Sequence, residues 1–135
     1  MQTTTFEVET GDREAIADIT QRCDAFVREC GGDGLLHVFV PHATAAIAVI
    51  ETGSGSDADL LAALRELLPA DDRWRHAHGA AGHGRSHVRP ALVAPYASFP
   101  VVSGRLQLGT WQSICLVDLN VDNGVRTVRL SLLRG

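Results

Sequence analysis

The sequence predicts an α+β fold: one compact domain in which two main helices pack on a largely antiparallel or mixed β-sheet. Two stretches in the first half repeat their apolar residues at helical spacing, whereas the second half consists of short apolar or alternating runs. A length of 135 residues fits a single domain over residues 1–135, and an apolar fraction of 45% is enough for one hydrophobic core.

Both helices are expected in the first half of the chain. The apolar residues of the first helix recur every three or four positions, and Gly31 and Gly32 end it because glycine readily adopts the backbone conformation that follows a helix. The second helix begins at Ser56 and stops before Pro69, because proline lacks a backbone N–H. The predicted elements are a strand at 3–8, a helix at 16–30, strands at 34–40 and 45–50, and a helix at 56–68.

The second half is rich in strands but begins with an irregular segment. Residues 71–95 show no periodicity and contain several glycines, so we expect a long loop, a feature that usually indicates function. The sequence Asp122-Asn123-Gly124 is typical of a tight turn, which predicts that the last two strands form a hairpin. The predicted strands are at 99–102, 105–108, 111–118 and 125–133.

The composition excludes several classes of protein. A net charge of −4 argues against a nucleic-acid partner, because phosphate backbones favour basic surfaces. All 12 basic residues are arginines, which excludes every mechanism that needs a lysine. No apolar run approaches the roughly 18 residues of a membrane span, and the first residues lack the features of a signal peptide. We therefore expect a soluble, cytoplasmic protein with no membrane partner.

The three cysteines are expected to be free thiols. Cys23 and Cys30 lie on the same predicted helix, which puts their Cα atoms about 10.5 Å apart, beyond the roughly 7 Å limit for a disulfide. Cys115 lies in an alternating apolar run and is expected to be a buried strand residue.

Histidines provide the first candidates for chemistry. The segment 71–95 holds His76, His78, His83 and His87, and three imidazoles are enough to bind a metal ion with one coordination position left open. Their spacing matches none of the short zinc-binding patterns, so a solvated loop that binds nothing is an equally open interpretation.

Further candidates lie at the ends of apolar strands. His42 follows one apolar run and Glu51 follows the next, at positions where binding sites are often built. Asp59 lies in the first turn of the second helix, where the helix dipole favours a carboxylate, so a purely structural role is also open for this residue.

Two groups of side chains are candidates for binding a substrate. Arg85 and Arg89 flank His87 and are suited to clamping phosphate oxygens. The segment 109–112 has no evident packing role and fits a ligand wall or a subunit contact. Its candidate residues are Thr110, Trp111 and Gln112.

Several of these residues together resemble the YjbQ-like family, whose members are known as secondary thiamine-phosphate synthases. The resemblance covers most of the chain, and the Gly-Thr-Trp-Gln sequence with two spaced histidines is its most specific part. The matching residues are Gly34-Leu35-Leu36-His37, His42-Ala43-Thr44-Ala45, Glu51, Asp59-Leu60, Pro69, Trp74-Arg75-His76, Ser86-His87-Val88-Arg89, Pro100-Val101, Gly104 and Gly109-Thr110-Trp111-Gln112.

The resemblance implies an α+β fold assembled as a homotrimer, with sites near the subunit boundaries. It implies that His42, His76 and His87 meet as metal ligands, and we assign catalytic roles to His42, Glu51, Asp59 and His87. The implied activity joins a hydroxymethylpyrimidine diphosphate to a thiazole phosphate and releases pyrophosphate. The implied cofactor is a divalent metal ion, either zinc-like at the histidines or magnesium with the substrate.

Two interpretations of function follow. The first is an enzyme, a thiamine-phosphate synthase-like transferase that acts on a small phosphorylated molecule. The second is a non-catalytic homotrimer that binds a metal ion or a small anion. The chain departs from the family pattern at Ala43, Ile50 and Ala77, where the family carries polar residues, and these departures favour the second interpretation.

Overall fold

The structure, a computed structural model, describes residues 1–135 as eight strands and three helices, with a short 3₁₀ segment after the third helix. The strands are β1 (Gln2–Glu9), β2 (Ala15–Asp18), β3 (Gly34–Phe39), β4 (Ala45–Ile50), β5 (Tyr96–Val102), β6 (Arg105–Leu106), β7 (Ser113–Asp118) and β8 (Val125–Arg134). The helices are α1 (Thr20–Cys30), α2 (Ser56–Leu67) and α3 (His83–Val88), and the 3₁₀ segment is Arg89–Ala91.

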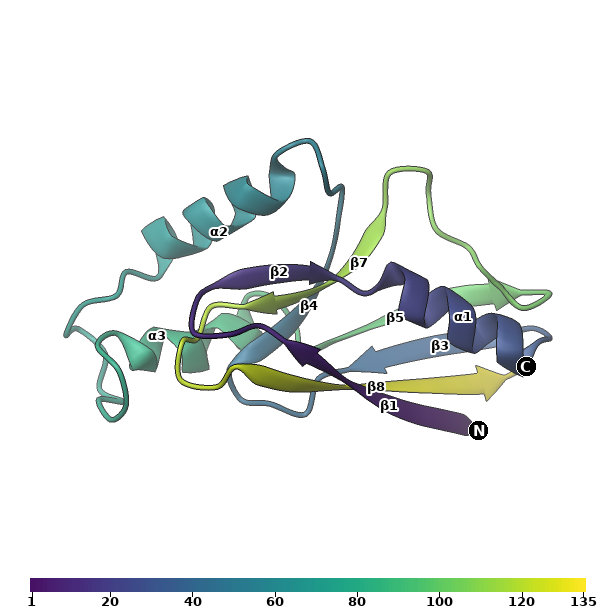
Figure 1. Ribbon diagram of the computed structural model, residues 1–135, viewed down its shortest axis with the longest axis horizontal. Coiled ribbons are helices and arrows are strands. Elements are labelled where there is room, and N and C mark those ends of the chain that lie inside the picture. The colour runs from purple at the N-terminus through teal and green to yellow at the C-terminus, as the bar shows by residue number, and fades with distance from the viewer.

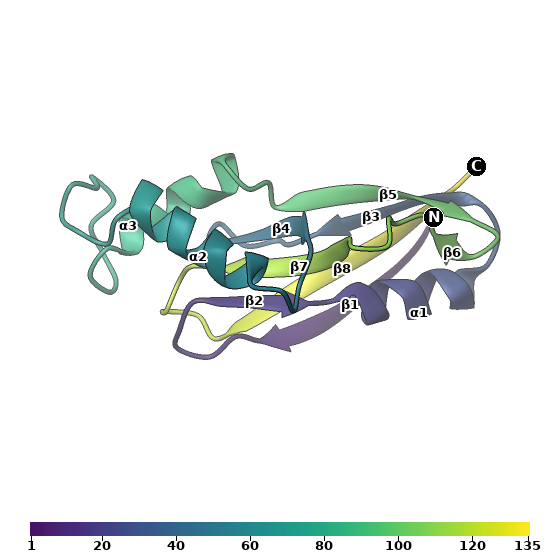
Figure 2. The same cartoon turned by 90° about the horizontal axis from the view of Figure 1, so that it is seen from above.

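The strands form two antiparallel sheets that lie one above the other (Figure 1). The larger sheet has the order β1-β8-β3-β5-β6 and the smaller has the order β2-β7-β4. Helix α1 continues the upper layer beside the smaller sheet, and α2 lies over the outer face of that sheet, as the view from above also shows (Figure 2). This arrangement confirms the predicted α+β class.

The main hydrophobic core fills the space between the two sheets and α1. The predicted alternation of β8 is confirmed, because Val128, Leu130 and Leu132 are buried in this core opposite Leu116 of β7. A smaller cluster packs α2 onto the smaller sheet through its buried Leu64. No helix is long and apolar enough to cross a membrane. The cytoplasmic location stays a prediction.

The three cysteines are free, as predicted. Cys23 and Cys115 are buried in the protein interior, and burial raises the pKa of each thiol to about 12. Cys30 lies at the end of α1 and is partly exposed. A thiol whose pKa is about 12 is protonated at neutral pH, so the two buried cysteines pack as small apolar residues.

No element covers the far face of the larger sheet (Figure 1). Alternate residues of its central strands point to this face, and five of their large apolar side chains are exposed: Leu35, Tyr96, Val102, Val125 and Leu133. An exposed apolar patch on a sheet is typical of a surface that binds another protein chain.

Two local predictions are wrong. Residues 15–18 are not the start of the first helix but form β2, which pairs with β7 from Asp118 to Cys115. The spacing of three residues between Ile16 and Ile19 fits a helix. Pairing of residues 15–18 with the buried strand β7 outweighs this local preference for a helix. The segment 71–95 is also not wholly irregular, because it contains α3 and the 3₁₀ segment.

The predicted hairpin between the last two strands is also wrong. β7 belongs to the smaller sheet and β8 to the larger, so the connection 119–124 passes from one sheet to the other (Figure 1). Its first residues are buried at the end of the sandwich. Turn residues mark a change of direction, but they do not specify which sheet the next strand joins.

Candidate functional site

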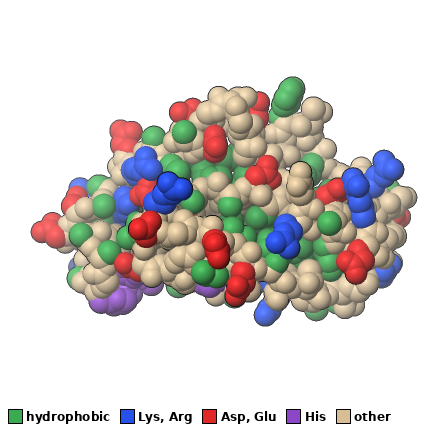
Figure 3. Space-filling view, viewed as in Figure 1, with side chains coloured by type: hydrophobic (Ala, Val, Ile, Leu, Met, Phe, Trp, Pro, Cys, Tyr) green, Lys and Arg blue, Asp and Glu red, His purple; other side chains and the backbone are tan.

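Four histidines gather at one end of the molecule, beside α3. His83 and His87 are four residues apart on this helix, and their Nε2 atoms are 2.8 Å from each other. His76 comes from the preceding loop and stacks on His87, with a ring-centre distance of 3.9 Å, and His78 lies against His76. Figure 3 shows histidine side chains on the surface at the lower left, where α3 lies in Figure 1.

Three of these histidines lie close enough together to hold a metal ion. One ligand nitrogen from each of His76, His83 and His87 lies within 4.8 Å of the other two. In a tetrahedral zinc site with Zn–N bonds of about 2.1 Å, the ligand nitrogens are about 3.4 Å apart. The observed spacing therefore needs only small side-chain movements to bind an ion.

Two of these histidines, His76 and His87, favour the uncharged form that binds metals. Burial lowers the pKa of His87, and the neighbouring His76, His83 and His78 lower it further. The pKa of His76 is lowered in the same direction by burial and by His78 and His83. The lowered pKa values of His76 and His87 favour neutral imidazole, which is the form that coordinates a metal.

A cavity adjoins the cluster. It has a volume of about 290 Å³ and is lined by His76, His83, Asp72 and Trp74, with small residues between them. The indole N–H of Trp74 donates to the carbonyl oxygen of Pro69 over 2.8 Å, which fixes the ring as one wall. The volume lies at the lower end of the range of about 300–1,000 Å³ that is typical of ligand pockets.

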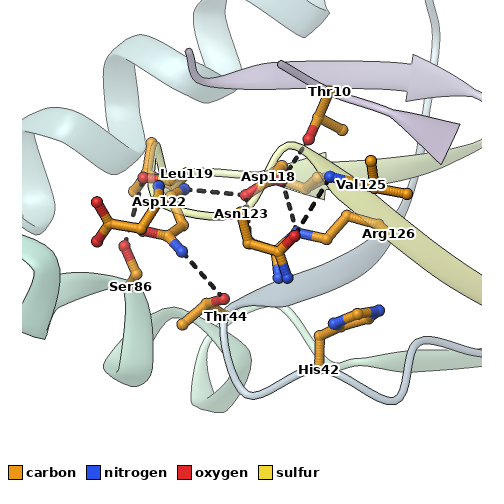
Figure 4. A network of polar contacts seen from close by, with 12 residues as sticks. Thr10, His42, Thr44, Ser86, Asp118, Leu119, Asp122, Asn123, Val125 and Arg126 are labelled. Atoms are coloured by element: carbon orange, nitrogen blue, oxygen red, sulfur yellow. Dashed lines mark hydrogen bonds and ion pairs between the residues drawn. The ribbon is translucent and has the colours of Figure 1, made fainter. Parts of the chain in front are cut away.

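The structure places His42 in a different environment. His42 follows β3 and lies below the polar network of Figure 4. Its Nε2 accepts a hydrogen bond from the backbone N–H of Thr127 over 2.9 Å. It does not belong to the group of three histidines. Burial lowers the pKa of His42, as does the nearby Arg126, while Asp118 acts in the opposite direction.

A buried ion pair lies near His42. The guanidinium of Arg126 donates to both carboxylate oxygens of Asp118, over 2.7 and 2.9 Å, and the Thr10 hydroxyl donates to the same carboxylate over 2.8 Å (Figure 4). Asp118 and Arg126 are both almost completely buried. This pair anchors the two ends of the connection between β7 and β8.

The two arginines that flank His87 are engaged inside the protein. Arg85 forms an ion pair with Glu14 and donates to the carbonyl oxygen of Leu68 over 3.1 Å. Arg89 is completely buried, and its Nη1 makes one long hydrogen bond of 3.4 Å to the carbonyl oxygen of Val117. Within one chain, neither guanidinium is available to a ligand at the histidines.

The remaining candidates lie on another part of the surface. Glu51 accepts a hydrogen bond from Ser54 over 3.2 Å, and Asp59 is exposed in the first turn of α2. The adjacent turn holds Thr110, Trp111 and Gln112, and Trp111 is 72% exposed. Both loops lie away from α3 in the two ribbon views (Figures 1 and 2). One chain therefore does not bring all of the sequence-predicted site residues together.

Two residues of the histidine group and its surroundings, His83 and Asp122, are absent from the predicted site. His83 was present among the candidates but not in the predicted ligand set, although its spacing of four residues from His87 is that of one helix face. Asp122 contacts His83 across a gap of 2.5 Å, and no local pattern marked it as a site residue.

The pKa of His42 leads to a testable acid sensitivity. The folded protein holds His42 neutral, whereas the unfolded chain takes up a proton near the ordinary pKa of 6.5. We therefore expect the free energy of unfolding to fall as the pH drops below about 6.5. Urea unfolding at a series of pH values checks this, and His42→Gln should flatten the curve. Identical pH profiles for the two proteins would contradict the prediction.

Two stacked antiparallel sheets with a histidine cluster at one end define a small α+β protein with a candidate metal centre. The chain matches the family model described as "UPF0047 protein YjbQ-like" over residues 4–135, so it belongs to the YjbQ-like family.

Relatives and solved structures agree with this assignment. The chain is 56% identical over 135 residues to the UPF0047 protein Rv2556c of Mycobacterium tuberculosis, covering 100% of both chains. It is 32% identical over 120 residues to YugU of Bacillus subtilis, covering 86% of this chain and 88% of that protein. A hypothetical protein, APE1520 of Aeropyrum pernix K1, has a similar structure, with a TM-score of 0.91, 35% identity and 100% coverage of both chains.

Proposed function

We propose that this protein binds a transition-metal ion through His76, His83 and His87, and that the bound ion in turn binds a small anionic or phosphorylated molecule. The observation that carries the proposal is the approach of three imidazole nitrogens to within 4.8 Å of one another. Nitrogen donors favour zinc, nickel or iron, whereas magnesium prefers oxygen donors. Three protein ligands leave one position open on a tetrahedral ion, where an anion is the natural fourth ligand.

The residues of this site fit a transition metal in a second respect. The Nδ1 atom of His83 is buried without a regular hydrogen bond, and the Asp122 carboxylate lies beside it. In zinc sites, the ring nitrogen of a ligand histidine that does not bind the metal usually contacts a carboxylate or another acceptor. A bound metal ion would supply positive charge that attracts phosphate oxygens. Within one chain the arginines do not supply this charge, because Arg85 is paired with Glu14 and Arg89 is completely buried.

Zinc titration of the purified, metal-free protein tests this proposal. Competition with a chromophoric chelator is expected to show one tight site per chain, and magnesium should not compete for it. Binding that is absent, or as weak as that of the same protein unfolded in urea, would overturn the proposal. The titration is repeated with inorganic pyrophosphate, which should bind only to the zinc-loaded protein.

A second candidate function is the transfer reaction of thiamine-phosphate synthase, for which family membership is the supporting observation. A cavity of about 290 Å³ is small for two phosphorylated molecules at once, so this reaction needs a site that more than one chain builds. The transferase would be supported if pyrophosphate is released when the pyrimidine diphosphate and the thiazole phosphate are both present, but not when only one of them is present. Release at the uncatalysed rate would exclude it.

We also propose that the chain assembles as a homotrimer, with Trp111 at a subunit contact. A tryptophan that is 72% exposed on an ordered turn is typical of a residue that another chain covers. The turn is ordered because Gln112 closes it: its backbone N–H donates to the carbonyl oxygen of Gly109 over 3.0 Å, and its side chain accepts from Gly109 N–H over 2.7 Å.

Trp111→Ala is therefore expected to weaken assembly by about 2 kcal/mol or more, the range of an interface hot spot, without loss of the fold. Analytical ultracentrifugation over a concentration series measures assembly, and circular dichroism checks the fold. Leu67→Ala is the matched control, because Leu67 is 64% exposed on α2. A wild type that stays monomeric at micromolar concentrations, or a Trp111→Ala variant that assembles normally, would refute this contact.

A further inference from the structure

Asp122 connects two parts of the molecule that are distant in the sequence. It lies in the connection between β7 and β8, and its Oδ2 atom is 2.5 Å from Nδ1 of His83 on α3. The same oxygen accepts a hydrogen bond from the backbone N–H of Ala80 over 3.3 Å. One carboxylate therefore holds both the ring of His83 and the loop that precedes α3.

This contact decides which nitrogen of His83 carries hydrogen. An ionised carboxylate only accepts hydrogen bonds, so the imidazole nitrogen that faces it must be the one that bears the hydrogen. Nδ1 of His83 is buried and has no hydrogen-bond partner elsewhere, so the carboxylate of Asp122 is the only polar group found against it. With the hydrogen on Nδ1, the lone pair of a neutral His83 is on Nε2, the atom that faces Nε2 of His87.

The position of Asp122 is itself fixed by the buried interior. Its backbone N–H donates to the side chain of Asn120 over 3.4 Å, and the backbone N–H of Asn120 donates to Asp118 over 3.0 Å. The side-chain amide of Asn120 donates to the Thr44 hydroxyl over 3.4 Å (Figure 4). A chain of polar contacts thus leads from the buried Asp118–Arg126 ion pair to the carboxylate at the surface histidines.

The loop opposite Asp122 is shaped to accept this carboxylate. Gly79 has a φ of +81°, and a Cβ atom at this position would lie 2.9 Å from Oδ2 of Asp122 and 3.0 Å from Cγ of His83. Any other residue at position 79 would therefore push the carboxylate or the ring out of place. The two sides of the contact fit each other closely.

We propose that Asp122 is the positioning residue of the histidine site: its carboxylate holds His83 with hydrogen on Nδ1 and thereby presents Nε2 to a metal ion. This inference rests on the proposed metal-binding function. Groups that contact the second ring nitrogen of a ligand histidine typically contribute 10–100-fold to metal affinity, because they orient the ring and raise its basicity.

Two measurements on the same variants test the inference. Nitrogen and carbon NMR shifts of the histidine rings in metal-free protein report the tautomer of His83, and zinc competition reports the affinity. Asp122→Ala should lower the fraction of His83 with hydrogen on Nδ1 and weaken zinc binding about 10–100-fold. Asp122→Asn keeps a neutral acceptor of the same shape, so its tautomer and affinity should lie between those of wild type and Asp122→Ala.

Asp72→Ala is the matched control. Asp72 is a carboxylate that lines the cavity beside His76 and His83, yet it makes no hydrogen bond or ion pair with a histidine. Its replacement should leave both the His83 tautomer and the zinc affinity unchanged. An equal effect of Asp72→Ala would show that only the charge near the site matters, which overturns the positioning role.

The outcomes separate this inference from the proposed function. A wild type that binds zinc, together with an Asp122→Asn variant and a folded Asp122→Ala variant that bind it equally well, overturns the role of Asp122 and leaves the metal site intact. A wild type that binds no zinc overturns the metal site and with it any role of Asp122 toward a metal. In that case the tautomer measurement still decides whether Asp122 controls His83.

Discussion

Replacing Asp118 by Ala is expected to destabilise the fold by about 3–5 kcal/mol, the usual cost of leaving one member of a buried ion pair without its partner. The carboxylate of Asp118 is completely buried and accepts hydrogen bonds from Arg126 and Thr10. Its removal leaves the Arg126 guanidinium buried with no counter-charge. Urea unfolding followed by circular dichroism measures the loss.

A second buried arginine makes this position more sensitive. Arg89 is completely buried, and two of its nitrogens have no hydrogen-bond partner. Burial lowers its pKa to about 10, and the attraction of Asp118 partly opposes this shift. Asp118 is thus a nearby negative charge for both buried arginines, so its loss affects both.

An exposed ion pair provides the control for this experiment. Asp71 pairs with Arg73 over 2.7 Å, but both side chains are largely in solvent, so Asp71→Ala should change the free energy of unfolding very little. If Asp118→Ala does not fold, Asp118→Asn retains the shape of the side chain and should give an intermediate loss. Equal stability of Asp118→Asn and Asp71→Ala would contradict the importance of the buried charge.

Much of the fold was predictable because periodicity reports burial. The alternation of β8 and the apolar face of α2 follow directly from which side chains contact the core. The strand at 15–18 was not predictable in this way, because its position depends on pairing with β7, which is distant in the sequence. The predicted hairpin at 119–124 was wrong for the same reason, since a turn sequence does not identify the sheet that the next strand joins.

For the candidate site, the sequence predicted part of the histidine group, and its metal chemistry stays a prediction. The concentration of histidines in the segment 71–95 indicated a metal site, and His76 and His87 do lie together. The third histidine of the group is His83 and not His42, because α3 puts His83 on the same face as His87. That helix has no apolar periodicity to reveal it, since it is short and contains glycine.

Replacing His87 by Ala is expected to weaken zinc binding at least 100-fold, because loss of a ligand should exceed the 10–100-fold cost of losing a group that contacts the second ring nitrogen of a ligand. His87 contacts both other members of the group: it stacks on His76, and its Nε2 is 2.8 Å from Nε2 of His83. His83→Ala should weaken binding to a similar extent. Zinc competition on metal-free protein, with circular dichroism to confirm folding, measures both variants.

Two further variants decide between the ligand set of the sequence analysis and that of the folded chain. His78→Ala is the control, because the His78 ring lies 4.1 Å from that of His76 but is not part of the group of three. It should bind zinc like wild type. His42→Ala should also retain binding if one chain builds the site, since His42 is engaged with the backbone of Thr127. The opposite result would be that His42→Ala loses as much zinc affinity as His87→Ala, while His83→Ala binds zinc like wild type. That result would reject the ligand set of His76, His83 and His87 and favour a site that His42 of a second copy completes.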